Sequence, residues 1–76
     1  MSRSPDQILA ETRTIALVGA SPRPERPSNS VMRYLLEAGY HVVPVRPVGP
    51  AEILGRRRVA SLAEIDEPID LVDVFR

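Results

Sequence analysis

The sequence of 76 residues contains no cysteine, which excludes disulfide bonds and thiolate metal sites. It contains one histidine, His41, so a metal centre built from several histidines is excluded as well. We therefore expect no metal cofactor. Aromatic residues make up only 4% of the chain, while 43% is hydrophobic, so the core must be largely aliphatic.

The chain also lacks an excess of charge of one sign, because ten basic and ten acidic residues give a formal net charge of zero. This balance disfavours nucleic acid and anionic membrane as partners. No apolar run approaches the ~20 residues of a membrane span, and the first residues have no apolar signal core. We therefore expect a cytoplasmic protein. All ten basic residues are arginine, whose planar guanidinium suits phosphate groups.

The spacing of apolar residues, prolines and glycines predicts alternating helices and strands. We expect strands at 14–18, 41–45 and 70–75. Helices should precede and separate them: a short one at 4–11, one from Ser28 or Asn29 to Ala38, and one of about one and a half turns that starts at a capping box at Ser61. Alternation of this kind predicts an α/β fold, namely a Rossmann-like doubly wound parallel sheet. Pro44 should bulge the second strand or leave one of its edges exposed.

We expect residues 1–76 to be the N-terminal half of such a domain, truncated to about three main strands with flanking helices. A doubly wound sheet normally continues with further strand–helix units. A complete minimal domain is the alternative. The last strand is apolar on both faces and has no partner beyond its far edge, so we expect self-association through this strand.

The loop that follows the first strand is the segment most indicative of function. It runs from Gly19 to Pro27 and leads into the amino end of a helix, where unpaired N–H groups and the helix dipole favour a phosphate. Gly19 permits a sharp turn and a close approach by a ligand. The polar and charged side chains of this pyrophosphate cradle are Ser21, Arg23, Arg26, Ser28 and Asn29. An ordinary turn with an ordinary helix cap is the alternative interpretation.

The identity of the nucleotide depends on the end of the second strand. The fingerprint G-x-G-x-x-G is absent, because Gly19 is the only glycine before residue 39. Arg46 stands where an acidic residue would hold an adenosine ribose, and an arginine there fits a ligand with an extra ribose phosphate. NADP and coenzyme A (CoA) both carry one. The long, proline-rich loop disfavours NADP. A solvated arginine is the alternative for Arg46.

The blocks GASPRPERPSNSVMRYLLEAGYHVVPVRP and ILGRRRVASLAEIDEPIDLVDVFR resemble the stand-alone bacterial CoA-binding proteins, which are related to the CoA-binding domain of the succinyl-CoA synthetase alpha subunit. The resemblance runs from about Arg13 to Arg76. It implies that CoA lies over Gly19, Ala20 and Ser21, with Ser28 and Asn29 at the helix start, Arg46 and Pro47 beside the adenine, and Phe75 and Arg76 along the pantetheine. The family has asparagine where Arg46 stands here, so that contact differs.

No catalytic apparatus is visible in the sequence. Ser21 has no histidine nearby in sequence, and no cysteine is available as a nucleophile. The leading hypothesis is therefore non-catalytic binding of CoA or an acyl-CoA through the first strand-to-helix loop. The alternatives are an NADP-binding fragment of a reductase or redox sensor, and an incomplete fragment without ligand.

Overall fold

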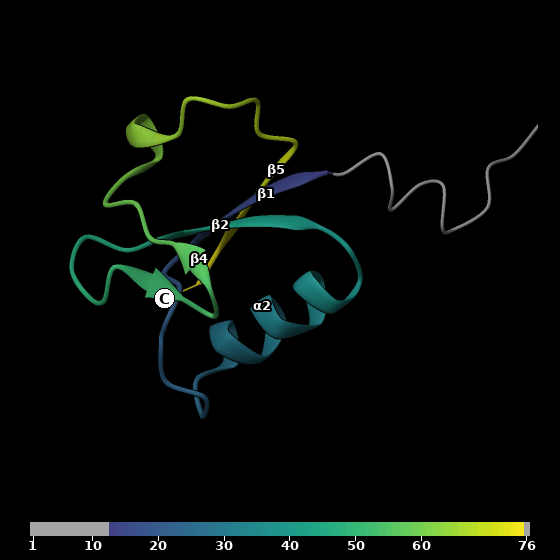
Figure 1. Ribbon diagram of the computed structural model, residues 1–76, viewed down its shortest axis with the longest axis vertical. Helices are drawn as coiled ribbons and strands as arrows, with labels where there is room; N and C mark the ends of the chain where they lie inside the picture. The colour runs from purple at the N-terminus through teal and green to yellow at the C-terminus, as the bar shows by residue number, and fades with distance from the viewer. Residues whose placement is uncertain (1–12, 76) are drawn as a thin grey trace, which may run out of the picture.

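A three-stranded parallel sheet with one long helix on its face forms the body of the molecule (Figure 1). The computed structural model describes residues 13–75, so the helix predicted at 4–11 and the terminal Arg76 lie outside the described residues. The strand order is β2-β1-β5, with bounds β1 Thr14–Val18, β2 His41–Val45 and β5 Leu71–Val74. These elements confirm the predicted α/β class and a small Rossmann-like arrangement.

Strand β1 lies at the centre of the sheet because it is apolar from Ile15 to Val18. Ile15 is opposite Val42 of β2 and Leu71 of β5, and the parallel register continues without interruption to Val18. Residues 15–17 are almost completely buried. A continuous aliphatic run of this kind is typical of a strand covered on both faces.

Strand β2 carries Pro44 without a bulge, since its pairing with β1 stays in register through that residue. The Pro44 carbonyl faces away from β1 and accepts a hydrogen bond of 3.0 Å from the Val59 N–H. The nitrogen of Pro44, which cannot donate, faces the same outer edge. Neither the predicted bulge nor the predicted exposed edge is found, because Val59 bridges Val45 on this edge and Pro44 is almost completely buried.

Helix α2, Pro27–Glu37, packs on one face of the sheet. The prediction that Ser28 or Asn29 caps this helix is wrong, because the N-cap is Arg26 and no side chain caps it. Pro27 explains the earlier start: its fixed φ and missing N–H suit the first helical position. The helix ends as predicted, with Gly39 in the left-handed region at φ +97°.

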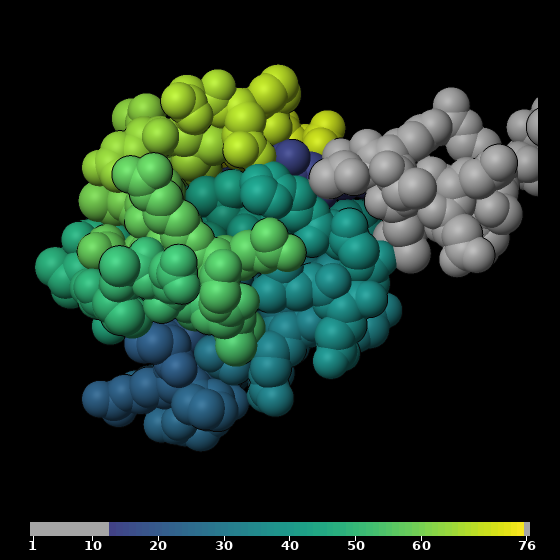
Figure 2. Space-filling model, in the orientation of Figure 1, coloured from purple at the N-terminus to yellow at the C-terminus, as the bar shows by residue number. Residues whose placement is uncertain are grey.

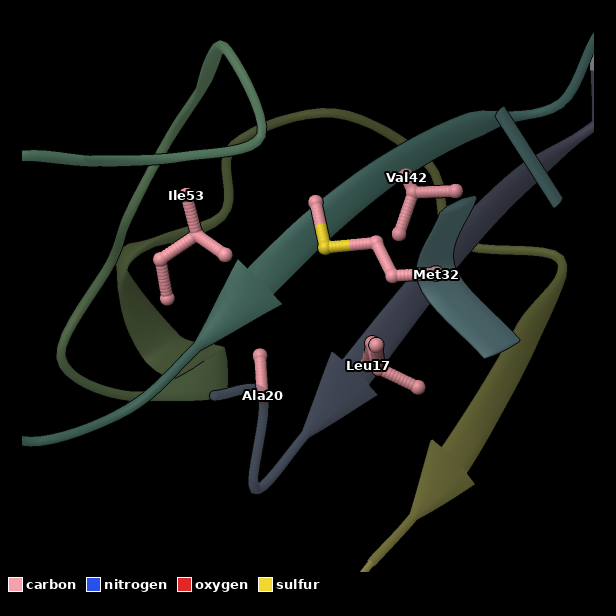
Figure 3. Close-up of a cluster of buried hydrophobic side chains, with 5 residues drawn as sticks. All are labelled: Leu17, Ala20, Met32, Val42 and Ile53. Carbon is pink, nitrogen blue, oxygen red and sulfur yellow. The ribbon is translucent and has the colours of Figure 1, made fainter. Parts of the chain in front are cut away.

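The segment after β2 contains a small antiparallel hairpin, which no pattern in the sequence predicted. Strands β3, Glu52–Ile53, and β4, Arg56–Arg57, are joined by a tight turn in which Leu54 and Gly55 both have positive φ. Ile53 anchors the hairpin, because its side chain is only 1% exposed. It belongs to the buried cluster formed by Leu17, Ala20, Met32, Val42 and Ile53 (Figure 3).

The predicted helix from Ser61 is a single 3-10 turn, η1, Leu62–Glu64. The Ser61 side chain makes no cap bond, whereas the Glu64 carboxylate accepts a hydrogen bond of 3.1 Å from the Ala60 N–H. Neither bond of the predicted capping box is therefore formed, because Glu64 bonds the residue before the cap. None of the helices within residues 13–75 is long and apolar enough to cross a membrane.

Strand β5 lies at the edge of the sheet opposite β2. Its apolar side chains remain largely open to solvent: Leu71 is 57% exposed, Val72 44% and Val74 61%. This exposure agrees with the apolar edge expected from the sequence. Self-association through β5 stays a prediction.

Candidate functional site

Gly19 turns the chain directly after β1, with φ +86°. Its N–H donates a 3.0 Å hydrogen bond to the Val45 carbonyl, and the neighbouring Val18 carbonyl accepts one of 2.8 Å from the Phe75 N–H. A Cβ atom at Gly19 would lie well inside contact distance of the Phe75 carbonyl oxygen. Glycine is therefore required by the close packing of backbone on backbone, before any ligand is considered.

A pocket of about 340 Å³ opens beside this turn, at the carboxyl ends of β1 and β5 and the amino end of α2. It is lined by Gly19, Ser21, Arg23, Arg26, Pro27, Ser28, Arg46 and Phe75, and we call it the arginine pocket. Figure 2 shows the loop of residues 20–26 projecting from the body of the molecule below the segment of residues 46–58. The pocket lies where parallel α/β sheets place their ligands.

The charge of this pocket is one-sided, because three arginines and no carboxylate line it. Within residues 13–75, no carboxylate lies within 4.0 Å of a guanidinium nitrogen of Arg23, Arg26 or Arg46. The one contact within 4.0 Å between a basic and an acidic side chain in that part of the chain joins His41 and Glu67, which do not line the arginine pocket. The pocket therefore offers positive charge that the described residues do not neutralise.

Arg46 reaches from the end of β2 towards the first loop. Its Nε donates a 2.8 Å hydrogen bond to the Val48 carbonyl, and its Nη1 lies 3.4 Å from the Ala20 carbonyl oxygen. Both acceptors are neutral, so neither contact brings a negative charge to the guanidinium. Among residues 13–75, no carboxylate pairs with the Arg46 side chain at the pocket wall.

Asn29 ties the first turn of α2 to the loop. Its Nδ2 donates a 2.8 Å hydrogen bond to the Ser21 carbonyl, and Ser21 Oγ accepts one of 3.1 Å from the Arg23 N–H. Asn29 is 2% exposed, and its Oδ1 has no hydrogen-bond partner among the residues that the structure describes. The amide of Asn29 therefore holds the Ser21 carbonyl with one of its two N–H bonds.

Backbone donors are also available in the wall. Ser21 and Ser28 line the pocket, and their N–H groups donate to no backbone carbonyl within residues 13–75. The helix dipole adds partial positive charge at Ser28, in the first turn of α2. Backbone amides, two serine hydroxyls and three guanidinium groups together form a donor set suited to phosphate oxygens.

The structure brings together most of the site predicted from the sequence. Gly19, Ser21, Arg26, Ser28, Arg46 and Phe75 all line the pocket. Ala20 is fully buried in the core, Asn29 lies behind the wall, and Pro47 does not line the pocket. Arg23, which the sequence places in the predicted cradle, lines the pocket as well, and Pro27 is the lining residue that sequence reasoning missed.

A second, larger pocket of about 700 Å³ runs along the outer edge of β2. It is lined by His41, Val42, Val43, Glu52, Gly55, Arg56, Arg57, Arg58, Val59, Glu64, Ile65, Asp66 and Glu67, and we call it the edge pocket. Four carboxylates there face three arginines, and Glu67 Oε1 lies 2.8 Å from His41 Nε2. In the part of the chain that the structure describes, no three His, Asp or Glu side chains gather as a metal site.

Residues 13–76 match the family of the CoA binding domain. An uncharacterized protein of Bacillus subtilis, YneT, is 49% identical over 70 residues, which are 92% of this chain and 51% of the relative. A hypothetical protein from Pyrococcus horikoshii is 43% identical, with a TM-score of 0.80 over 100% of this chain and 60% of that one. A structure from Thermus thermophilus is 42% identical, with a TM-score of 0.80 over 97% and 58%. The chain thus spans just over half the length of these relatives.

Proposed function

The chain belongs to the CoA binding domain family, and we propose from this premise that the arginine pocket binds CoA or an acyl-CoA. Binding would be non-catalytic, through the loop between β1 and α2.

The one-sided charge of the pocket is the observation that carries the proposal. CoA has a pyrophosphate and a phosphate on the ribose, so it needs a site with several cationic donors and no nearby carboxylate. Arg23, Arg26 and Arg46 supply such a site at the amino end of α2. Charge-assisted hydrogen bonds to phosphate are about twice as strong as neutral ones.

Each part of the wall has a distinct task in this proposal. The N–H groups of Ser21 and Ser28, with Arg23 and Arg26, would hold the pyrophosphate. Arg46, at the end of β2, would hold the ribose phosphate. Phe75 would border the path of the pantetheine arm.

NADP is the alternative ligand that a specific observation favours. It also carries a pyrophosphate and a ribose phosphate, so Arg46 fits either compound. Family membership favours CoA. The glycine-rich turn of dinucleotide sites is also missing, because the loop holds Pro22, Pro24 and Pro27 and only one glycine.

Isothermal titration of the chain with CoA, dephospho-CoA and NADP in parallel tests the proposal. We expect CoA to bind tightest, and dephospho-CoA to bind more weakly by about 1.5–3 kcal/mol, which is about tenfold to 150-fold. Tighter binding of NADP than of CoA would support the alternative. Absence of binding by a folded chain would show a fragment without ligand and would overturn the proposal.

A further inference from the structure

Arg58 joins the two ends of the turn that carries Arg46. Its Nη1 donates a 2.7 Å hydrogen bond to the Arg46 carbonyl, and its Nε donates one of 2.8 Å to the Pro50 carbonyl. We propose that Arg58 is a positioning residue that fixes Arg46 at the pocket wall and thereby sets the preference for a ligand with a ribose phosphate. This inference rests on the function proposed above.

The turn of residues 46–50 has few other constraints. The Arg46 N–H donates to the Val59 carbonyl at 2.9 Å, and the Arg58 N–H donates to the Ala51 carbonyl at 2.9 Å. Among residues 13–75, one further bond lies within the turn, from Arg46 Nε to the Val48 carbonyl. Among residues 13–75, Arg58 is thus the one residue whose side chain donates hydrogen bonds to both ends of the turn, an arrangement we call the clamp.

Gly49 brings the two arginine side chains to the same place. A Cβ atom at Gly49 would lie 3.4 Å from Arg46 Cδ and Nε and 3.6 Å from Arg58 Cδ. The two stems therefore pack against the same backbone position, where Gly49 has φ +140°. Backbone carbonyls accept from both guanidinium groups, and no carboxylate within residues 13–75 pairs with either one.

Arg58 acts through Arg46, because it lines the edge pocket and does not line the arginine pocket. The clamp requires an arginine for a geometric reason. A planar guanidinium donates in two fixed directions and reaches two carbonyls at once, whereas a lysine is a single point of charge. Lysine at position 58 would preserve the charge and lose the clamp.

The ratio of the affinities for CoA and dephospho-CoA is the decisive readout. Arg58→Met and Arg58→Lys should both lower this ratio by about threefold to tenfold, the loss of roughly one net hydrogen bond. The affinity for dephospho-CoA should change by less than about twofold, which also shows that each variant is folded. Arg57→Met is the matched control, because Arg57 is exposed and makes no such clamp, and its ratio should equal that of the unmodified chain.

The outcomes separate this inference from the proposed function. If Arg46→Met lowers the ratio while both Arg58 variants retain it, the positioning role is wrong and the proposed function stands. If Arg58→Lys retains the ratio and Arg58→Met loses it, charge alone is sufficient and the clamp is also wrong. If the unmodified chain does not bind CoA, or binds both compounds equally, the proposed role of Arg46 fails and the inference fails with it. Arg58→Lys carries the test if Arg58→Met does not fold.

Discussion

The two pockets of this molecule differ in size and in charge. Size favours the edge pocket as the ligand site, whereas charge favours the arginine pocket. The edge pocket is about twice as large, at about 700 Å³ against about 340 Å³. Its arginines, however, face four carboxylates, whereas the arginine pocket has cationic side chains only. A polyanionic ligand is selected by unneutralised positive charge and not by volume, so the smaller pocket is the better candidate.

Each pocket also contains a glycine in the left-handed region, and these two glycines provide the test with the largest expected effect. Gly19→Ala should lower the free energy of unfolding by about 3–5 kcal/mol, from backbone strain together with the clash on Phe75. Gly55→Ala carries similar strain at φ +77° but has nothing within 4 Å, so its cost should be about 1–2 kcal/mol. Urea denaturation measures both. Equal costs would show that the Phe75 contact does not explain the glycine.

Arginines from the two pockets provide the next test. Arg46→Met should weaken CoA binding by about 1.5–3 kcal/mol, since a charge-assisted bond to phosphate is lost. Arg57→Met, in the edge pocket, should change the affinity by less than about twofold, because only screened long-range charge is removed. Titration calorimetry of both variants gives the comparison. A greater loss of CoA affinity for Arg57→Met than for Arg46→Met would show that CoA binds in the edge pocket.

Strand β5 borders the arginine pocket, because Phe75 follows it directly, and its exposed edge is where we expect a second copy of the chain to pair. Analytical ultracentrifugation at micromolar concentration should show a dimer. Val74→Lys should shift the chain to the monomer, since a charged residue on an edge strand opposes pairing. Sedimentation of the unmodified chain as a monomer would disprove self-association.

Loss of the contact between His41 and Glu67 in the edge pocket should have the smallest effect of these tests. His41 and Glu67 lie 2.8 Å apart, but their side chains are 36% and 42% exposed. Glu67→Gln should therefore lower the free energy of unfolding by less than about 1 kcal/mol. It should leave CoA affinity unchanged. A larger loss in either quantity would show that the edge pocket matters more than its balanced charge indicates.

The elements that were predicted correctly are those marked in the sequence by a continuous apolar run or by a glycine. The strands at 14–18 and 41–45 and the left-handed Gly39 follow from such patterns. The hairpin of β3 and β4 was missed, because two-residue strands are too short to produce a period, and only the buried Ile53 reveals why it is docked.

The site was predicted by residue type more successfully than by role. Gly19 was assigned to close approach by a ligand, whereas a Cβ atom there would collide with the backbone of Phe75, which follows β5 and lies 56 residues later in the chain. Asn29 was assigned to the helix cap, and its amide instead holds the Ser21 carbonyl. The contact between Gly19 and Phe75 joins segments so far apart in sequence that no local pattern marks it.

Amide chemical shifts of the ¹⁵N-labelled chain during a titration with CoA test the central claim most directly. The account predicts that the resonances of Gly19, Ser21, Ser28 and Arg46 move with a common saturation curve. Those of Gly55, Arg57 and Glu64, in the edge pocket, should stay in place. Shifts that are confined to the edge pocket, or the absence of any saturable shift in a folded chain, would contradict it.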